Sequence, residues 1–158
     1  LHKEYRRQRQ MCIRDSGYGE HNIQGIGDKH VPLIHNVMNS DFVVGVSDEA
    51  TNNLNLLFNT NEGKKYLESR KGFEKDFVNR LPEFGFSSIA NIIASIKLAK
   101  KMKLSKNDAI ITVATDGADL YETELAKTKK QFNKIYDEVT CAEIFAKNFE
   151  AITVDHTL

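Results

Sequence analysis

The sequence predicts an α/β protein of three layers, in which a mostly parallel sheet has helices on both faces and further helices follow at the C-terminal end. Two short apolar runs, 41–47 (DFVVGVS) and 109–115 (AIITVAT), have the continuous Val, Ile and Phe content of strands buried on both faces. Between them, 87–103 places apolar residues at mostly helical spacing. Strand, helix and strand in this order indicate βαβ units, whose strands are parallel.

The elements between the two predicted strands are helical. Ser47 is a candidate N-cap, followed by Asp48 and Glu49 in the first turn, where carboxylates favour the positive end of a helix. We expect this helix to continue to about Phe58 and to end at the polar residues 59–61. Shorter helices are expected over 62–70 and from 73–79.

The second half begins with a helix over 87–103, which we expect to face the core and to be capped by Ser87 or Ser88. From Leu120 onward, an apolar stripe predicts one or two amphipathic helices. The predicted organisation is therefore an α/β domain over 17–125 and a helical extension over 126–158.

The first sixteen residues differ from the rest of the chain. They contain five Lys or Arg, have no periodic apolar face, and end in MCIRDS, which resembles translated sequencing-adaptor read-through. A solvated tail and a basic arm for phosphate contacts are the other readings. We therefore expect 1–16 to be a non-native or disordered segment.

Composition limits the classes of protein. A 158-residue chain with 41% hydrophobic residues can form the core of one domain without disulfides or metal. Its 22 basic and 22 acidic residues cancel, so we expect neither nucleic acid nor a membrane as partner. Cys12 and Cys141 lack CxxC spacing, and no apolar run reaches the roughly 18 residues of a membrane span. Together with the absence of a signal-peptide core, this predicts a cytoplasmic protein.

A glycine-punctuated loop precedes the first predicted strand. Gly25, Ile26 and Gly27 would let the backbone approach a ligand closely, although a GxG alone is more often a turn. A dinucleotide fingerprint does not fit, because the loop has no third glycine and does not follow a strand.

Three histidines, His21, His30 and His35, with Asp28 as a fourth ligand, are candidates for a metal site. Pro32 lies between the last two histidines and argues against a simple helical pair of ligands. We therefore predict no metal. A serine hydrolase is likewise not indicated, since the chain has no GxSxG motif.

Three segments, 21–32 (HNIQGIGDKHVP), 83–91 (EFGFSSIAN) and 111–121 (ITVATDGADLY), resemble in order and spacing the C-terminal half of pyridoxal-phosphate enzymes of the cysteine synthase and cystathionine β-synthase family. These are fold-type-II enzymes, similar to the tryptophan synthase β subunit. The resemblance covers about 17–121. It implies pyridoxal 5'-phosphate as cofactor, a small amino acid as substrate, and a homodimer for the full-length protein.

The resemblance also implies roles for individual residues. Gly25, Ile26 and Gly27 would line the cofactor pocket, and Asp28 would lie in the substrate pocket. Ser87, in the pattern glycine, one residue, serine, would contact the pyridine nitrogen. Thr115 and Asp116 would border the pyridine ring at the end of the last strand, and a carboxylate facing the nitrogen would keep it protonated.

The family's Schiff-base lysine, its cofactor-flanking asparagine and its phosphate loop have no counterpart in this chain, so no catalytic residue is assigned. The expected function is a fragment of an enzyme for β-elimination or β-replacement, inactive alone. Alternatives are a serine or threonine dehydratase, a diaminopropionate ammonia-lyase, or a non-catalytic α/β binding module.

Overall fold

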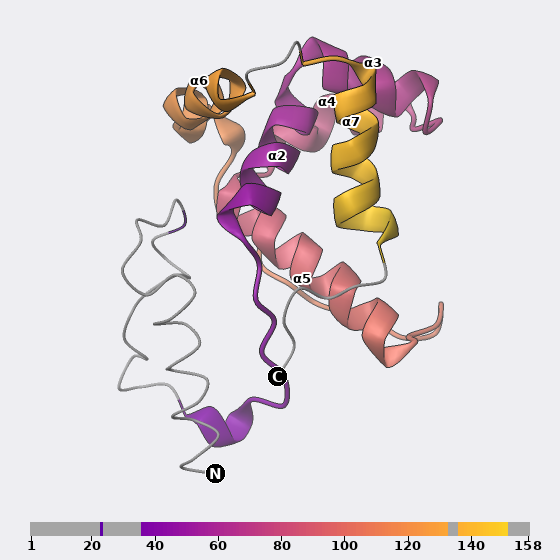
Figure 1. Ribbon diagram of the computed structural model, residues 1–158. Helices are drawn as coiled ribbons and strands as arrows, with labels where there is room; N and C mark the ends of the chain where they lie inside the picture. Colours follow the sequence, from indigo (N-terminus) through magenta and orange to yellow (C-terminus); the bar gives the residue numbers. More distant parts are fainter. Residues whose placement is uncertain (1–22, 24–35, 133–135, 152–158) are drawn as a thin grey trace.

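The computed structural model describes residue 23 and residues 36–132 and 136–151. Its longer elements are α2 (Asp48–Asn59), α3 (Asn61–Ser69), α4 (Lys75–Arg80), α5 (Phe86–Met102), α6 (Glu122–Gln131) and α7 (Glu138–Phe145). Short turns of helix complete the list: η1 (Val37–Asn39), η2 (Leu81–Glu83), η3 (Ala118–Tyr121) and η4 (Ala146–Glu150). Figure 1 shows these helices grouped around α2 and α5, with extended segments leading into α2 and out of α5.

The predicted α/β fold is wrong for the part of the chain that the structure describes, which is helical and contains no strand or sheet. Of the predicted strand 41–47, Val44 makes an isolated bridge, and of 109–115 every residue is non-helical and exposed. Ile111 is 95% exposed and Val113 is 65% exposed. A strand of β-branched residues is stable only when neighbours pair its backbone and cover its side chains, and the described residues supply neither.

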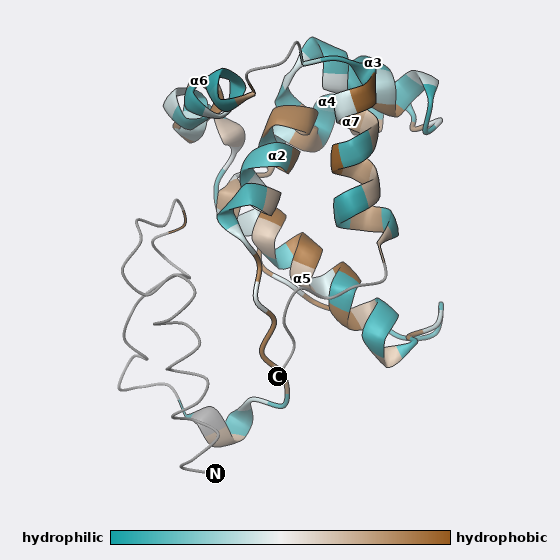
Figure 2. Cartoon of the chain, viewed as in Figure 1, coloured by the Kyte–Doolittle hydropathy of each residue, from teal (hydrophilic) through white to brown (hydrophobic). Residues whose placement is uncertain are grey.

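Segment 109–115 instead runs back along the first turns of α5. The Asn91 side chain donates to the Val113 carbonyl at 2.9 Å, and the Thr115 N–H donates to the Ser88 hydroxyl at 3.1 Å. Figure 2 shows the apolar character of this extended chain beside α5. The segment is therefore fixed to a helix through side chain to backbone hydrogen bonds rather than through a strand ladder.

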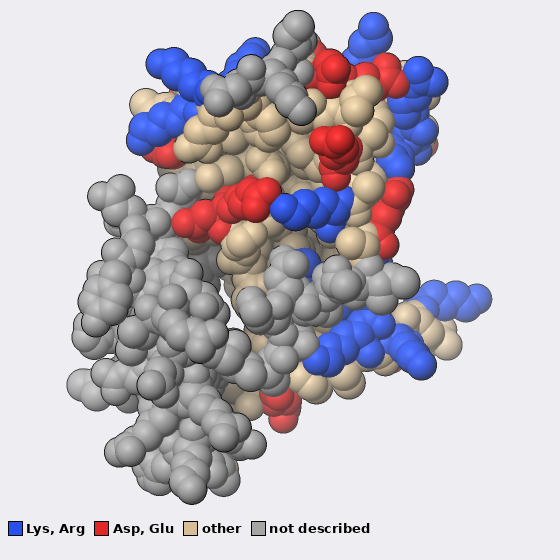
Figure 3. Space-filling view, in the orientation of Figure 1, with Lys and Arg blue, Asp and Glu red and all other residues tan. Residues whose placement is uncertain are grey.

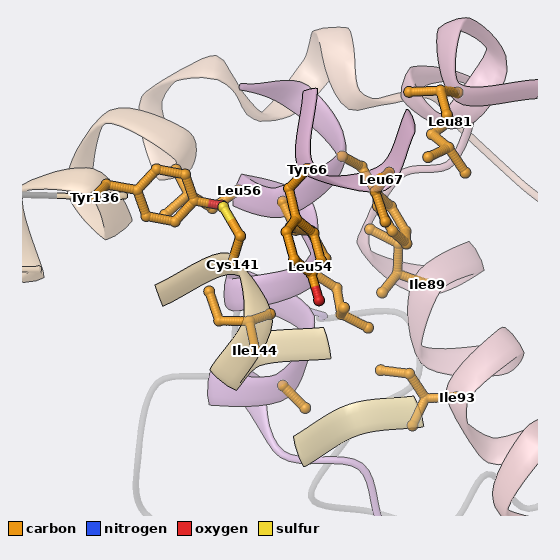
Figure 4. Close-up of a cluster of buried hydrophobic side chains, with 14 residues drawn as sticks. Leu54, Leu56, Tyr66, Leu67, Leu81, Ile89, Ile93, Tyr136, Cys141 and Ile144 are labelled. Carbon is orange, nitrogen blue, oxygen red and sulfur yellow. The ribbon is translucent and has the colours of Figure 1, made fainter. Parts of the chain in front are cut away.

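Helix α2 is the centre of the molecule and contacts α3, α5, α6 and α7. Its start is as predicted, because the Ser47 side chain accepts from the Ala50 N–H at 3.2 Å. Buried side chains from several elements meet around it (Figure 4), among them Leu54, Leu56, Tyr66, Leu67, Ile89, Ile93, Cys141 and Ile144. This core holds α5 in place and so positions the residues at its N-terminus.

Among the described residues, no helix has an apolar stretch long enough to cross a lipid bilayer.

Candidate functional site

The N-terminus of α5 brings together residues from two segments that the sequence singles out. Gly85 is the N-cap of α5, and its N–H donates to the Asp116 carbonyl at 2.7 Å. A Cβ at Gly85 would lie 2.6 Å from Asp116 Oδ1 and 2.9 Å from the Asp116 carbonyl oxygen. A side chain there would therefore collide with this segment, and glycine is what permits the turn at 115–121 to lie against the helix end.

A small hydrogen-bond network surrounds the Asp116 carboxylate. Tyr121 donates its hydroxyl proton to Asp116 Oδ2, and the Thr115 hydroxyl donates to Oδ1 at 2.9 Å. The Tyr121 ring packs on the buried Phe86 ring, with 4.5 Å between ring centroids. The network thus holds Asp116 at the entrance of α5 through contacts to both of its carboxylate oxygens.

These contacts shift the pKa values of both groups. The hydrogen bond from Tyr121 is the main cause that lowers the pKa of Asp116, against the opposing effect of partial burial. Burial, followed by the hydrogen bond to Asp116, raises the pKa of Tyr121 to about 12. At neutral pH the pair is therefore a carboxylate accepting from a neutral phenol.

The structure separates the two serines that sequence alone leaves equivalent. Neither caps α5, because the N-cap is Gly85 and no side chain caps this helix end. The predicted capping role is therefore wrong. Ser88 is buried and accepts from Thr115, so it ties the two segments together. Ser87 lies in the first turn, is half-buried, and has no hydrogen bond to its hydroxyl within the described part of the chain.

Of the remaining predicted site residues, Gly25, Ile26, Gly27 and Asp28 lie outside the described residues. The candidate metal-ligand histidines at 21, 30 and 35 also lie outside the described residues. Within the described residues, no group of three or more His, Cys, Asp or Glu is placed to hold a metal ion.

Sequence reasoning missed two members of the cluster. Tyr121 lies at the end of segment 111–121, whose sequence indicates no role for it, and the sequence indicates Gly85 only as part of a glycine-to-serine pattern. The Tyr121 ring is positioned by packing against Phe86, a buried aromatic residue in the first turn of α5. No spacing rule in the sequence indicates that contact.

The charge of the cluster limits the groups that it can bind. A helix N-terminus with uncapped N–H groups attracts anions, but here the Asp116 carboxylate already lies against it. A phosphate group would meet that negative charge. A cationic group, by contrast, would suit the carboxylate, and a neutral hydrogen-bond acceptor would suit the Ser87 hydroxyl.

The α5 N-terminus and the turn at 115–121 therefore form a polar cluster that carries the Asp116 carboxylate and the Ser87 hydroxyl. Comparison of the chain with protein-family models, with curated proteins and with solved structures finds no match.

Proposed function

We propose that the α5 N-terminus and the turn at 115–121 form the pyridine-ring end of a pyridoxal-phosphate site. The site would belong to an enzyme that eliminates or replaces a β-substituent on a small amino acid. The observation that carries the proposal is that Ser87 and Asp116, both implied by the resemblance to contact the ring, come from separate segments and lie at one helix end. The proposal rests on this cluster and requires no sheet.

Each residue of the cluster would have a distinct task. Asp116, ionised at neutral pH, would be the partner of a protonated ring nitrogen, and Ser87 would be the partner of an unprotonated one, so that only one of the two would bind the nitrogen. Ser88 and Gly85 would fix the distance between the helix end and the turn. Tyr121 would orient the Asp116 carboxylate through its hydroxyl.

The identity of the ring partner would decide the chemistry of the complete enzyme. The cofactor, when bound, acts as an electron sink for the carbanion formed at the substrate's α-carbon. A carboxylate partner strengthens that sink, and a hydroxyl partner moderates it in the way that suits β-elimination and β-replacement. Product analysis with serine and cysteine-like substrates would separate a synthase from a dehydratase or an ammonia-lyase.

The catalytic lysine must come from another segment, because no lysine here lies in the family's sequence context. Proton transfer at the α-carbon is the task of that lysine. We therefore expect the 158-residue chain to show no turnover of serine, cysteine or O-acetylserine, even when the cofactor is supplied.

A cofactor analogue without the aldehyde tests ring binding on this chain. 4-Deoxypyridoxine 5'-phosphate cannot react with surface lysines, so any effect reports non-covalent binding. In a titration followed by amide chemical shifts, we expect weak, saturable changes concentrated at 85–88 and 115–121. Asp116→Asn should abolish these changes.

Asp108→Asn is the control, because Asp108, like Asp116, is a carboxylate that accepts hydrogen bonds, here from Ser105, and it lies away from the cluster. This variant should bind the analogue like the wild type. Changes spread over the lysine-rich end of α5, or changes that survive Asp116→Asn, would overturn the proposal.

A further inference from the structure

A cavity of about 520 Å³ lies among the helices, and one of its lining residues, Phe84, directly precedes Gly85 at the start of α5. Ten Phe, Leu and Ile side chains line it, contributed by α2, α3, α4, α5, α7 and the turns between them. Ile92 and Ile96, one turn apart on α5, form one wall. Ligand pockets in proteins span about 300–1,000 Å³ and are mostly apolar, so this cavity has the size and lining of a binding site for an apolar group.

The mouth of the cavity is marked by exposed aromatic rings. Phe77 is 51% exposed and Phe73 is 39% exposed, with 5.6 Å between their ring centroids. Contiguous exposed apolar surface beside a cavity is a common mark of a ligand-binding groove. An apolar chain that entered here would remove both rings and the cavity wall from water.

Two ammonium groups lie beside lining phenylalanines, on the side where the Phe145 ring is 6.3 Å from the Phe73 ring at the mouth. Lys71 Nζ is 4.3 Å from the centroid of the Phe145 ring, and Lys100 Nζ donates to the Phe149 carbonyl. Both phenylalanines line the cavity. One carboxylate, Glu150, pairs with Lys71 at 2.5 Å. Basic side chains also gather where α5 ends, at the lower right of Figure 3.

From this arrangement we infer that the cavity binds a free medium-chain fatty acid. Its alkyl chain lies between the Phe73 and Phe77 mouth and the Ile92 and Ile96 wall. Its carboxylate lies at Lys71 and Lys100, where it takes the place of Glu150 beside Lys71. Charge complementarity selects the carboxylate, and the entirely apolar lining selects the unsubstituted chain. None of the lining residues belongs to the proposed cofactor site.

Calorimetric titration of the 158-residue chain with decanoate, below its micelle concentration, tests the inference. Each methylene buried adds apolar contact, so octanoate should bind about tenfold more weakly than decanoate. The double variant Lys71→Gln and Lys100→Gln should bind decanoate about three- to tenfold more weakly, because it removes both charges. The same variant should bind decanol as the wild type does.

Two further variants locate the ligand. Ile96→Trp fills the cavity and should abolish decanoate binding, with circular dichroism showing that the helices remain. Lys130→Gln removes an exposed lysine from α6 and should leave binding unchanged. Because the lysine variants leave the apolar core intact, they test the site even where Ile96→Trp unfolds the protein.

Several outcomes would overturn the inference. These are equal binding of decanoate by the wild type and the double lysine variant, unchanged binding by a folded Ile96→Trp variant, or no decanoate binding. A chain that binds phosphatidylglycerol vesicles but not free decanoate would instead recognise a lipid surface.

Discussion

Thr60 joins α2 to α3 through a single buried hydroxyl. It donates to the Leu56 carbonyl at 2.8 Å and accepts from the Gly63 N–H at 3.2 Å, so it ends one helix and caps the next. We expect Thr60→Ala to lower the free energy of unfolding by about 1–2 kcal/mol, as the loss of a cap and a buried hydrogen bond does.

Urea denaturation followed by circular dichroism measures this change. Ser69→Ala is the control, since the Ser69 hydroxyl also donates to a carbonyl four residues earlier but is exposed. It should change stability by no more than about 0.5 kcal/mol. Equal effects of the two substitutions would show that Thr60 does not hold the junction.

The Asp116 and Tyr121 pair gives stability a defined pH dependence. The pKa of Asp116 is lowered from 3.8, so its contribution is present above that value and is lost as the pH falls through its folded-state pKa. The pKa of Tyr121 is raised from 10.0 to about 12, so its contribution is present below pH 10.0 and is lost as the pH rises towards about 12.

Asp116→Asn should therefore remove part of the acid-side loss of stability, and Tyr121→Phe part of the alkaline-side loss. Unfolding free energies of both variants, compared with the wild type across pH, measure the effect. Because burial is the larger cause for Tyr121, its phenol should still titrate above 10.0 in Asp116→Asn. If the unfolding free energy of Asp116→Asn fell at acid pH as much as that of the wild type, the proposed pairing of Asp116 with Tyr121 would be contradicted.

At the scale of elements, the exposure of the apolar run 109–115 distinguishes the helical fold from the α/β fold. In a central strand Ile111 would be a core residue, but here it is 95% exposed, whereas Ile93 on α5 is 1% exposed. We expect Ile111→Ser to change the free energy of unfolding by less than about 0.5 kcal/mol, and Ile93→Ala to lower it by about 3 kcal/mol. Comparable losses from both substitutions would indicate a buried strand at 109–115.

The helices were predictable because their signals are local. Ser47 followed by acidic residues marks the start of α2, and the polar residues after Phe58 mark its end. The absence of strands was not predictable, because a run such as AIITVAT shows only that its residues are apolar. Whether neighbours pair and cover it depends on the rest of the molecule, which a short run does not encode.

The candidate site was predictable in part. The sequence placed Ser87 near a helix start and Thr115 and Asp116 in a turn, and the structure brings these segments together. It could not tell Ser87 from Ser88, because that difference is a hydrogen bond between residues 27 positions apart. It also could not find Tyr121, whose place depends on ring packing against Phe86.

At the scale of the whole molecule, both proposals depend on a helical core around α2, with segment 109–115 lying outside it. Hydrogen exchange measures the protection of each backbone amide and so tests this arrangement residue by residue. Amides of 110–113 should exchange rapidly, since within the described part of the chain this segment is held to α5 by side chain to backbone hydrogen bonds and not by a paired strand. Amides of Leu56 and Ile93, inside buried helices, should exchange only through global unfolding. Protection of 110–113 equal to that of Ile93 would mean that the segment is a paired, buried strand and would contradict the helical arrangement.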